Sequence, residues 1–269
     1  MPTQDEKAER FRALHEGDAF IIPNPWDAGS AKVFAALGFH ALATTSSGFA
    51  FTLGRPDGSV TLDEVAAHVR LLADATDLPV SVDLENGFGP APEDAARAIR
   101  RAADAGAVGG SIEDHDPATG LYDMNHAAER IAAAVEAARG CGFPFTLTAR
   151  AENHIRGNPD LDDTIARLQS YQEAGADVLY APGLSDLDDI RRVVSAVDRP
   201  VNVLALPNAP SVAELGSVGV KRISVGGAFM YVAFGALAEA ARELLEQGTY
   251  GFWATAGAGA GVARGALTR

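Results

Sequence analysis

The sequence predicts an α/β fold, a (β/α)8 barrel of the TIM type, and three observations support this prediction. Short apolar runs rich in strand-forming residues recur along the chain, and each is followed by a turn and a helical pattern. The runs alternate strictly with the helical segments, which favours parallel strands joined by helices. Eight such units in about 250 residues have the size of a closed barrel. In chain order the runs are FIIP (20–23), HALATTSS (40–47), PVSVDLE (79–85), VGGSIED (108–114), FPFTLTAR (143–150), DVLYAP (177–182), PVNVLAL (200–206) and KRISVGG (221–227).

The strand runs look continuously apolar, as expected of strands that are buried on both faces. The segments between them are rich in Ala and Leu at helical spacing, and several end at Gly, which commonly follows a helix C-terminus. An open, doubly wound sheet is the competing architecture, because strand count alone does not show closure. No glycine-rich phosphate-binding fingerprint supports that alternative. The helical segments are SAKVFAALG, LDEVAAHVRLLADAT, APEDAARAIRRAADAG, HAAERIAAAVEAARG, LDDTIARLQSYQEAG and LDDIRRVVSAV.

The chain continues past the eighth strand into an extended apolar helix, within VGGAFMYVAFGALAEAARELLEQGTYGF. We expect residues 1–253 to form a single (β/α)8-barrel domain. The remaining residues, 254–269, are rich in Ala and Gly, and we expect them to form a flexible tail.

The composition excludes several classes of function. A formal net charge of −14 offers no basic surface to nucleic acid or to an anionic membrane. Cys141 is the only cysteine, so neither an intrachain disulfide nor a CxxC metal or redox motif can form. The N-terminal segment is charged, and no run of about 18 apolar residues occurs. We therefore expect a soluble, cytoplasmic protein that binds neither nucleic acid nor membranes.

Acidic residues gather where the third and fourth strands end. Asp83 and Glu85 close the third strand, and the two-residue period of a strand predicts that they share one face. Glu113 and Asp114 close the fourth strand, which is its neighbour. Converging carboxylates repel one another unless a cation lies among them, and hard oxygen ligands select Mg²⁺ or Mn²⁺. Because barrel active sites lie at the C-terminal ends of the strands, the cluster predicts a metal-dependent site there.

Each of these acids could instead cap a following helix or pair with an arginine. Capping does not explain two acids on one inward face followed by an acid pair on the next strand, so we favour the metal site. Arg150 ends the fifth strand and suits carboxylate recognition, although it could equally pair with Glu113 or Glu152. We expect it to do both. The second strand ends in TTSSG, whose hydroxyls and N–H groups can form a nest for an anion, a weak signal when taken alone.

These residues together resemble the isocitrate lyase and phosphoenolpyruvate mutase superfamily. The resemblance covers most of the chain, and its specific part is the ordered set of strand ends. It runs through NPWDAGSAKVFAALGFHALATTSSG, GRPDGSVTLDEV, VDLENGFG, the segment 106–114, TAR and EAGADVLYAPG.

The resemblance implies a role for each matching residue. Asp83 looks like the direct Mg²⁺ ligand, while Asp57, Glu85 and Glu113 would hold the water molecules of the metal. Arg150 matches an arginine that contacts the substrate. The family also implies a tetramer, or at least a dimer, in which C-terminal helices are exchanged. The segment that binds a substrate carboxylate in the family is occupied here by Thr45, Ser46 and Ser47.

The sequence departs from the family where the reaction is decided. The lyases carry a catalytic cysteine in a KKCGH-like motif after the fourth strand, but this loop reads HDPATGLYDMN. Cys141 precedes the fifth strand at the opposite rim of the barrel, so it cannot replace that cysteine. The mutase pattern EDKxFPKxNS is absent as well. The glutamate that the lyases place after the sixth strand is replaced within Ala181-Pro182-Gly183, and their asparagine after the seventh strand is lost within VNVLALPNAP.

These features predict a Mg²⁺-dependent lyase or decarboxylase that cleaves a C–C bond of a small 2-oxo or 2-hydroxy acid through an enolate. Two alternatives are a C–P hydrolase or mutase of the phosphonopyruvate type and a non-catalytic protein that binds 2-oxo acids. Proton transfer would need a side chain from the replaced loop. His115 is the first candidate there, ahead of Asp116, Tyr122 and His126. Its alternative role is to support the neighbouring pair Glu113 and Asp114 without transferring a proton.

Overall fold

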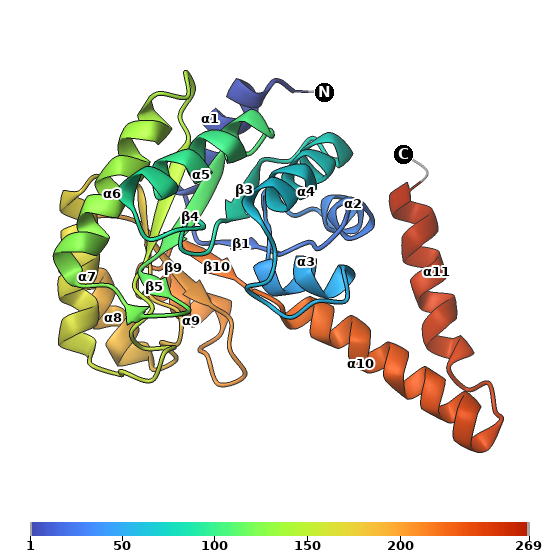
Figure 1. Ribbon diagram of the computed structural model, residues 1–269. Coiled ribbons are helices and arrows are strands. Elements are labelled where there is room, and N and C mark those ends of the chain that lie inside the picture. Colours follow the sequence, from blue (N-terminus) through green and yellow to red (C-terminus); the bar gives the residue numbers. More distant parts are fainter. Residues whose placement is uncertain (1, 268–269) are drawn as a thin grey trace.

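In the computed structural model, which describes residues 2–267, eight parallel strands form a barrel surrounded by helices (Figure 1). The strands follow one another around the barrel in chain order. A single backbone hydrogen bond, from Ala43 N to Pro23 O at 3.1 Å, joins the first strand to the second and closes the ring. The predicted (β/α)8 barrel is therefore confirmed, and the doubly wound alternative is wrong. The strands are β1 (Phe20–Ile22), β2 (Leu42–Ala43), β3 (Val80–Asp83), β4 (Gly109–Glu113), β7 (Thr146–Arg150), β8 (Val178–Tyr180), β9 (Val201–Leu204) and β10 (Arg222–Ser224).

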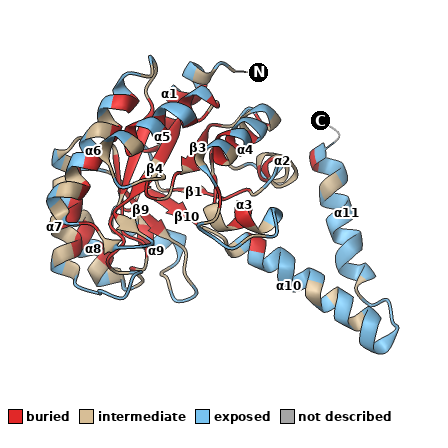
Figure 2. Ribbon diagram, in the orientation of Figure 1, coloured by how far each residue is buried: buried red, intermediate tan, exposed pale blue. Residues whose placement is uncertain are grey.

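The helices pack their apolar faces on the outside of this ring, and Figure 2 shows buried residues in the strands and on the surrounding helices. Polar side chains define where several of them begin. Thr61 caps α4 in a reciprocal pair with Glu64, and Asp160 accepts two N–H bonds at the start of α7. The helices are α1 (Gln4–Leu14), α2 (Ala28–Ala36), α3 (Ser46–Thr52), α4 (Leu62–Ala75), α5 (Pro92–Asp104), α6 (Met124–Arg139), α7 (Leu161–Glu173), α8 (Leu187–Ala196), α9 (Val212–Ser217), α10 (Ala228–Arg242), a π-helical segment (Glu243–Gln247) and α11 (Trp253–Leu267).

In β3, β7, β9 and β10 apolar and polar residues alternate, which differs from the continuous apolar pattern that the sequence led us to expect. In β3, Val80 and Val82 are buried, while Ser81 and Asp83 line a cavity inside the barrel. β10 shows the same alternation. The outward residues pack under the helices, and the inward residues make the centre of the barrel polar.

Helix α1 closes the end of the barrel that is opposite to the strand C-termini. Phe11 is fully buried, and a Cβ at Gly109 would lie only 2.7 Å from its ring. His15 follows the helix and makes edge contacts with Phe11 and Phe20. The barrel is therefore open to ligands only from the end where the strands finish.

The C-terminal helices leave the barrel. α10 extends away from it and α11 turns back, so that the end of α11 packs against α2 (Figure 1). The sequence predicted a flexible tail over 254–269; the structure describes a helix over most of it, and residues 268–269 lie outside the described part. The division into barrel and tail stays a prediction. None of the helices within residues 2–267 is long and apolar enough to cross a membrane.

Candidate active site

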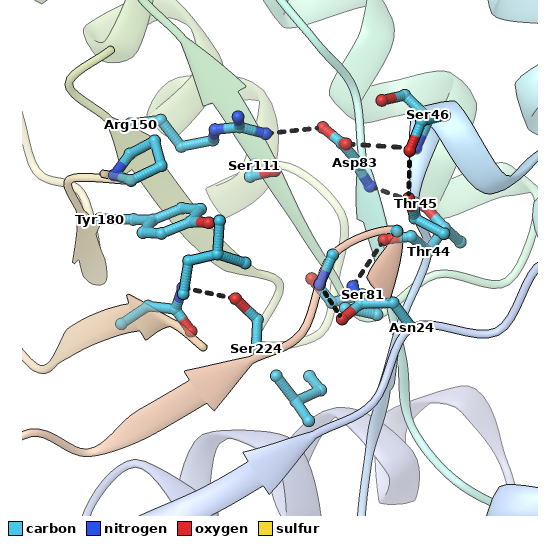
Figure 3. A pocket seen from close by; sticks show the side chains of 18 of the residues that line it. Asn24, Thr44, Thr45, Ser46, Ser81, Asp83, Ser111, Arg150, Tyr180 and Ser224 are labelled. Atoms are coloured by element: carbon cyan, nitrogen blue, oxygen red, sulfur yellow. Dashed lines mark hydrogen bonds and ion pairs between the residues drawn. The ribbon is translucent and has the colours of Figure 1, made fainter. Parts of the chain in front are cut away.

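A polar cavity of about 180 Å³ opens at the C-terminal ends of the strands (Figure 3). Every strand of the ring contributes at least one residue to the lining of this cavity. Its lining includes Asn24, Thr44, Thr45, Ser46, Ser47, Asp57, Ser81, Asp83, Ser111, Arg150, Tyr180, Asn202, Arg222 and Ser224.

Arg150 is the centre of the charged part of this site. Its guanidinium lies 3.0 Å from Asp83 Oδ1, 3.2 Å from Glu113 Oε2 and 2.8 Å from Glu152 Oε1. Burial alone would lower the pKa of Arg150, but the three carboxylates raise it well above its ordinary value. The guanidinium also lies over the ring of Tyr180, 5.2 Å from its centroid. Both expected partners, Glu113 and Glu152, are therefore in contact with it.

Asp83 is fixed between the second and fifth strands of the ring. Its backbone N–H donates to Thr44 Oγ1 at 2.8 Å, and its Oδ2 accepts from Ser46 N at 3.3 Å. Figure 3 shows the Asp83 carboxylate pointing toward Arg150 from one side and held by the start of α3 from the other. One oxygen of this carboxylate thus faces each side of the cavity.

Glu85 lies outside the lining of the cavity, and its direction differs from the one expected. β3 ends at Asp83, and Glu85 has a φ of 49°, so the alternation of a strand does not set its direction. The residue instead begins a tight turn closed by a bond from Gly87 N to Leu84 O. Burial, together with Asp83 and Asp57, raises the pKa of Glu85 to about 7. Its Oε1 is buried and has no hydrogen-bond partner among the described residues.

The two acids at the end of β4 have separate environments. Glu113 contacts Arg150 and lies 3.6 Å from Arg156, and burial raises its pKa well above the ordinary value. Asp114 points away from the cavity, where it bonds to Arg167 and to the hydroxyl of Tyr171. Asp114 therefore has the structural role that we held open for any one of these acids.

The remaining predicted residues lie at the mouth of the cavity. Asp57 lines it from the exposed loop between α3 and α4. Thr45 caps α3, and its hydroxyl lies 3.1 Å from that of Ser47. Ser46 also lines the cavity, so the structure brings these three residues together with Asp83.

The loop that replaces the family's catalytic loop forms a small antiparallel hairpin of β5 (His115–Asp116) and β6 (Gly120–Leu121). His115 lies outside the lining of the cavity, and burial and Arg156 lower its pKa. The hydroxyl of Tyr122 bonds to Asp116, and His126 Nε2 lies 2.9 Å from Pro90 O on the surface. None of the four candidates for proton transfer, His115, Asp116, Tyr122 and His126, lines the cavity.

Comparison with known proteins identifies the family. The phosphoenolpyruvate phosphomutase family profile matches residues 11–245. The chain belongs to the phosphoenolpyruvate phosphomutase family. Among its relatives, an uncharacterised protein of Mycobacterium tuberculosis is 34% identical over 85% of both chains. A 2-methylisocitrate lyase of Halalkalibacterium halodurans is 32% identical over 74% of this chain and 67% of its own.

Solved structures of phosphoenolpyruvate phosphomutase family relatives share the fold closely. A candidate lyase/mutase from Burkholderia cenocepacia J2315 is 56% identical and superposes with a TM-score of 0.90, covering 93% of this chain and 91% of its own. A 2,3-dimethylmalate lyase of the same superfamily is 28% identical, with a TM-score of 0.83 over 93% of this chain and 90% of its own. The relatives whose names give an activity are lyases or mutases, and this chain is expected to be an enzyme.

The sequence did not single out several residues that line the cavity of this family member. They lie within short strands or just after one, and the alternation between polar and apolar residues was the available signal. Asn24 is one of them, and its Oδ1 accepts from Val225 N and Gly226 N, which joins β1 to the end of β10. The others are Tyr180, Asn202, Arg222 and Ser224.

The carboxylates fit the divalent cation that the family implies. No three His, Cys, Asp or Glu side chains within residues 2–267 converge tightly enough to enclose an ion by themselves. Mg²⁺ keeps several water molecules and commonly takes only one or two carboxylates from a protein. Glu85 Oε1, buried and unpaired, is an acceptor that a metal-bound water could satisfy. The donor set consists of oxygens alone, as a hard cation requires.

Proposed function

We propose that this chain is a Mg²⁺-dependent carbon–carbon lyase that acts on a small 2-oxo or 2-hydroxy acid through an enolate, with Mn²⁺ as a substitute metal. The observation that carries this proposal is the convergence of Asp83 and Arg150 in one small polar cavity, 3.0 Å apart. A carboxylate for a cation and a guanidinium for a substrate carboxylate are the two recognition groups that such an acid needs. Two relatives named as lyases support the same class of reaction.

In this proposal Asp83 is the direct ligand, and Asp57, Glu85 and Glu113 hold the water molecules of the ion. The ion, when bound, supplies a Lewis acid that stabilises negative charge developing on the substrate oxygens. Buried carboxylates with raised pKa values are consistent with a site that gains from a cation.

The chain's own residues bind and orient the acid. Arg150 offers its guanidinium to one substrate carboxylate, and the Tyr180 ring fixes the plane of that guanidinium. Thr45, Ser46 and Ser47 provide hydroxyl and N–H donors to the same carboxylate from the start of α3. His115, on the hairpin of β5 and β6, is our candidate for proton transfer once the hairpin moves over the cavity.

The alternatives have different products. A C–P hydrolase or mutase would act on phosphonopyruvate, but the loop at 115–125 lacks the mutase pattern. A non-catalytic binding protein would take up a 2-oxo acid in the presence of Mg²⁺ without turnover.

The test is an assay of purified protein with Mg²⁺ against oxaloacetate, isocitrate, methylisocitrate, malate and phosphonopyruvate. Release of a 2-oxo acid from one of the first four is expected, whereas phosphate from phosphonopyruvate would favour C–P chemistry. Binding without any product would leave the binding protein as the correct description.

Asp83→Ala is expected to abolish Mg²⁺-dependent ligand binding, because it removes the direct ligand, while far-UV circular dichroism stays unchanged. Asp63→Ala is the matched control, since Asp63 is an exposed acid that pairs with Arg101 on the surface, away from the cavity. Retained Mg²⁺ dependence in Asp83→Ala would refute the assignment of the ligand.

We also propose that the chain forms a homo-oligomer, a dimer or a tetramer, through its C-terminal helices. Apolar side chains of α10 are exposed, among them Val232 at 68% and Leu237 at 65%. A surface of this kind on a helix that leaves its own barrel favours association with another copy.

A further inference from the structure

Arg130 is a buried cation on helix α6 whose partners are neutral. The residue is 1% exposed and is the largest fully buried side chain among residues 2–267. Within that part of the chain it forms no ion pair with a carboxylate, and its terminal nitrogens donate to three backbone carbonyls. Its Nε is buried and has no hydrogen-bond partner there. Because burying a charge is costly, these contacts are expected to have a role beyond packing.

The three carbonyls belong to one segment, the turn that follows β3. Nη1 of Arg130 donates to Gly89 O at 2.7 Å and to Ala91 O at 3.1 Å. Nη2 donates to Asn86 O. A guanidinium is planar and presents its donors in a fixed geometry, so the three acceptors are fixed relative to one another. One side chain therefore defines the path of the backbone from residue 86 to residue 91.

The backbone of this turn is strained. Glu85, Gly87 and Phe88 have φ angles of 49°, 81° and 61°. Glycine adopts such angles freely, but residues with side chains keep them only where the surrounding structure fixes them. Within the turn, Phe88 N donates to Asn86 Oδ1 at 3.1 Å. Arg130 supplies the further contacts that hold this conformation from outside the turn.

Tyr122 keeps the guanidinium directed at the turn. The guanidinium carbon of Arg130 lies over the Tyr122 ring, 4.6 Å from its centroid. The Tyr122 hydroxyl accepts from Asn86 Nδ2 and donates to Asp116 Oδ2, each at 3.3 Å. Arg130 and the aromatic ring beneath it thus form one support, which joins α6 to the turn and to the hairpin of β5 and β6.

Glu85 is the residue through which this turn reaches the acidic cluster. The charges of Asp83 and Asp57 act on its carboxylate, so the three acids lie close together. Its Oε1 is buried and unpaired, and its backbone O accepts from Glu113 N at 2.9 Å. A shift of the turn would therefore move an unpaired acceptor relative to Asp83.

We propose that Arg130 is a positioning residue for the metal site: it holds the turn so that Glu85 Oε1 accepts a hydrogen bond from a water molecule of the cation. Arg130 lies outside the lining of the cavity, and its effect passes through the backbone of residues 86–91. The inference rests on the proposed function. It adds to the metal site a residue from a helix on the outside of the barrel.

The experiment measures Mn²⁺ binding to the full chain by electron paramagnetic resonance, which counts the free ion, together with urea unfolding. Arg130→Lys keeps the positive charge, but an ammonium lacks the planar fork that spans the three carbonyls. Binding of Mn²⁺ is expected to weaken roughly 10- to 100-fold, as is typical when a residue that supports metal ligands is changed.

Arg139→Lys is the matched control. Arg139 lies on the same helix, pairs with Asp177 and donates to the carbonyls of Phe145 and Gly175. These residues precede β7 and β8, at the end of the barrel opposite to the cavity. Both variants are expected to unfold at lower urea concentration than wild type, whereas Mn²⁺ affinity should fall only in Arg130→Lys. Unchanged affinity in a less stable Arg130→Lys would show a purely structural role and overturn the inference.

Glu85→Gln separates positioning from a general loosening of the site. This change removes the carboxylate charge but keeps its shape, and by itself it should weaken Mn²⁺ binding. If Arg130 acts through Glu85, the double variant should bind Mn²⁺ as well as Glu85→Gln alone does. A second loss of the same size in the double variant would contradict the proposed route.

A crystal structure of wild-type protein with Mn²⁺ tests the inference even if Arg130→Lys fails to fold. A water molecule of the ion within hydrogen-bond distance of Glu85 is expected, and Glu85 turned away from the ion would overturn the inference. Wild-type protein that binds no Mn²⁺ would show that the proposed function is wrong as well. Wild-type and Arg130→Lys proteins that bind it equally would refute the inference alone.

Discussion

Arg150 balances only part of the negative charge around it. Five carboxylates surround this end of the barrel, and the guanidiniums of Arg150 and Arg156 are the cations in contact with them. Burial makes such an excess costly, and the raised pKa values of Glu85 and Glu113 are its consequence. The five are Asp57, Asp83, Glu85, Glu113 and Glu152. A cation bound at this site therefore stabilises the folded protein, because it offsets part of the excess negative charge.

Arg150→Met is expected to destabilise the metal-free protein by about 3 kcal/mol or more, because it leaves buried carboxylates without their partner. Urea unfolding followed by circular dichroism measures this loss. Arg156→Met is the matched control: Arg156 contacts Glu113 and Glu152 as well, but its side chain is 42% exposed, so about 1 kcal/mol or less is expected. Equal losses in the two variants would contradict the central role of Arg150.

At the level of single residues, the sequence predicted the acids and the arginine at the strand ends but not the polar floor of the cavity. Asp83 and Arg150 could be predicted because strand C-termini in a barrel share one rim. Asn202 and Arg222 lie inside short strands, where a polar residue ordinarily indicates a solvent-facing position. Only the closure of the ring shows that this face is the interior.

The end of β3 is the place where the predicted local geometry was wrong. The strand pattern was extended through Glu85, but β3 ends at Asp83 and the following turn needs a positive φ at Glu85. This conformation is uncommon for a residue with a side chain and costs of the order of 1–3 kcal/mol. The Asn86-Gly87 pair is a turn signal, but it does not show that the strand ends two residues earlier, at Asp83.

Helix α4 buries His68 in surroundings that disfavour its charged form. The ring stacks on Phe49 with centroids 4.0 Å apart, and Nε2 lies 2.9 Å from Trp26 O. Because a carbonyl can only accept, Nε2 carries the proton of a neutral ring. Burial lowers the pKa of His68 from 6.5 to about 4. Between pH 6.5 and pH 4, His68 therefore binds a proton in the unfolded chain but not in the folded chain.

The contribution of His68 to stability is expected to be fully present above pH 6.5 and to be lost as the pH decreases toward 4. At pH 5 the proton taken up by the unfolded chain costs the fold about 2 kcal/mol at His68 alone. His68→Gln keeps a donor for Trp26 O and does not titrate, so it should lose about 2 kcal/mol less than wild type between pH 7 and pH 5. Urea unfolding at the two pH values measures the difference. The same loss in both proteins would show that His68 is not the group responsible.

At the scale of the whole molecule, the sequence predicted the barrel because its signal is repeated eight times. Each βα unit predicts the same architecture, so an error in one predicted strand or helix boundary does not change the predicted fold. The C-terminal region has no such repetition. The many Ala and Gly residues of the segment 254–269 predicted a flexible tail. The structure describes α11 as a helix whose end packs against α2. Helix formation in that region depends on contacts made beyond the local sequence.

The exposure of α10 leads to the last prediction. Its apolar residues cover much of its circumference, and Figure 2 shows α10 and α11 as largely exposed beyond the barrel. A single barrel cannot bury this surface, so we expect a dimer or tetramer in which a second copy covers it. Leu237→Asp places a charge in that contact and should shift the mass measured by light scattering toward the 27.9 kDa of one chain. Leu71→Asp alters an equally ordinary exposed leucine, 51% accessible on α4, and should leave the mass of the oligomer unchanged. A wild-type protein that already has the mass of one chain would contradict the proposed oligomer and leave the apolar surface of α10 without its expected partner.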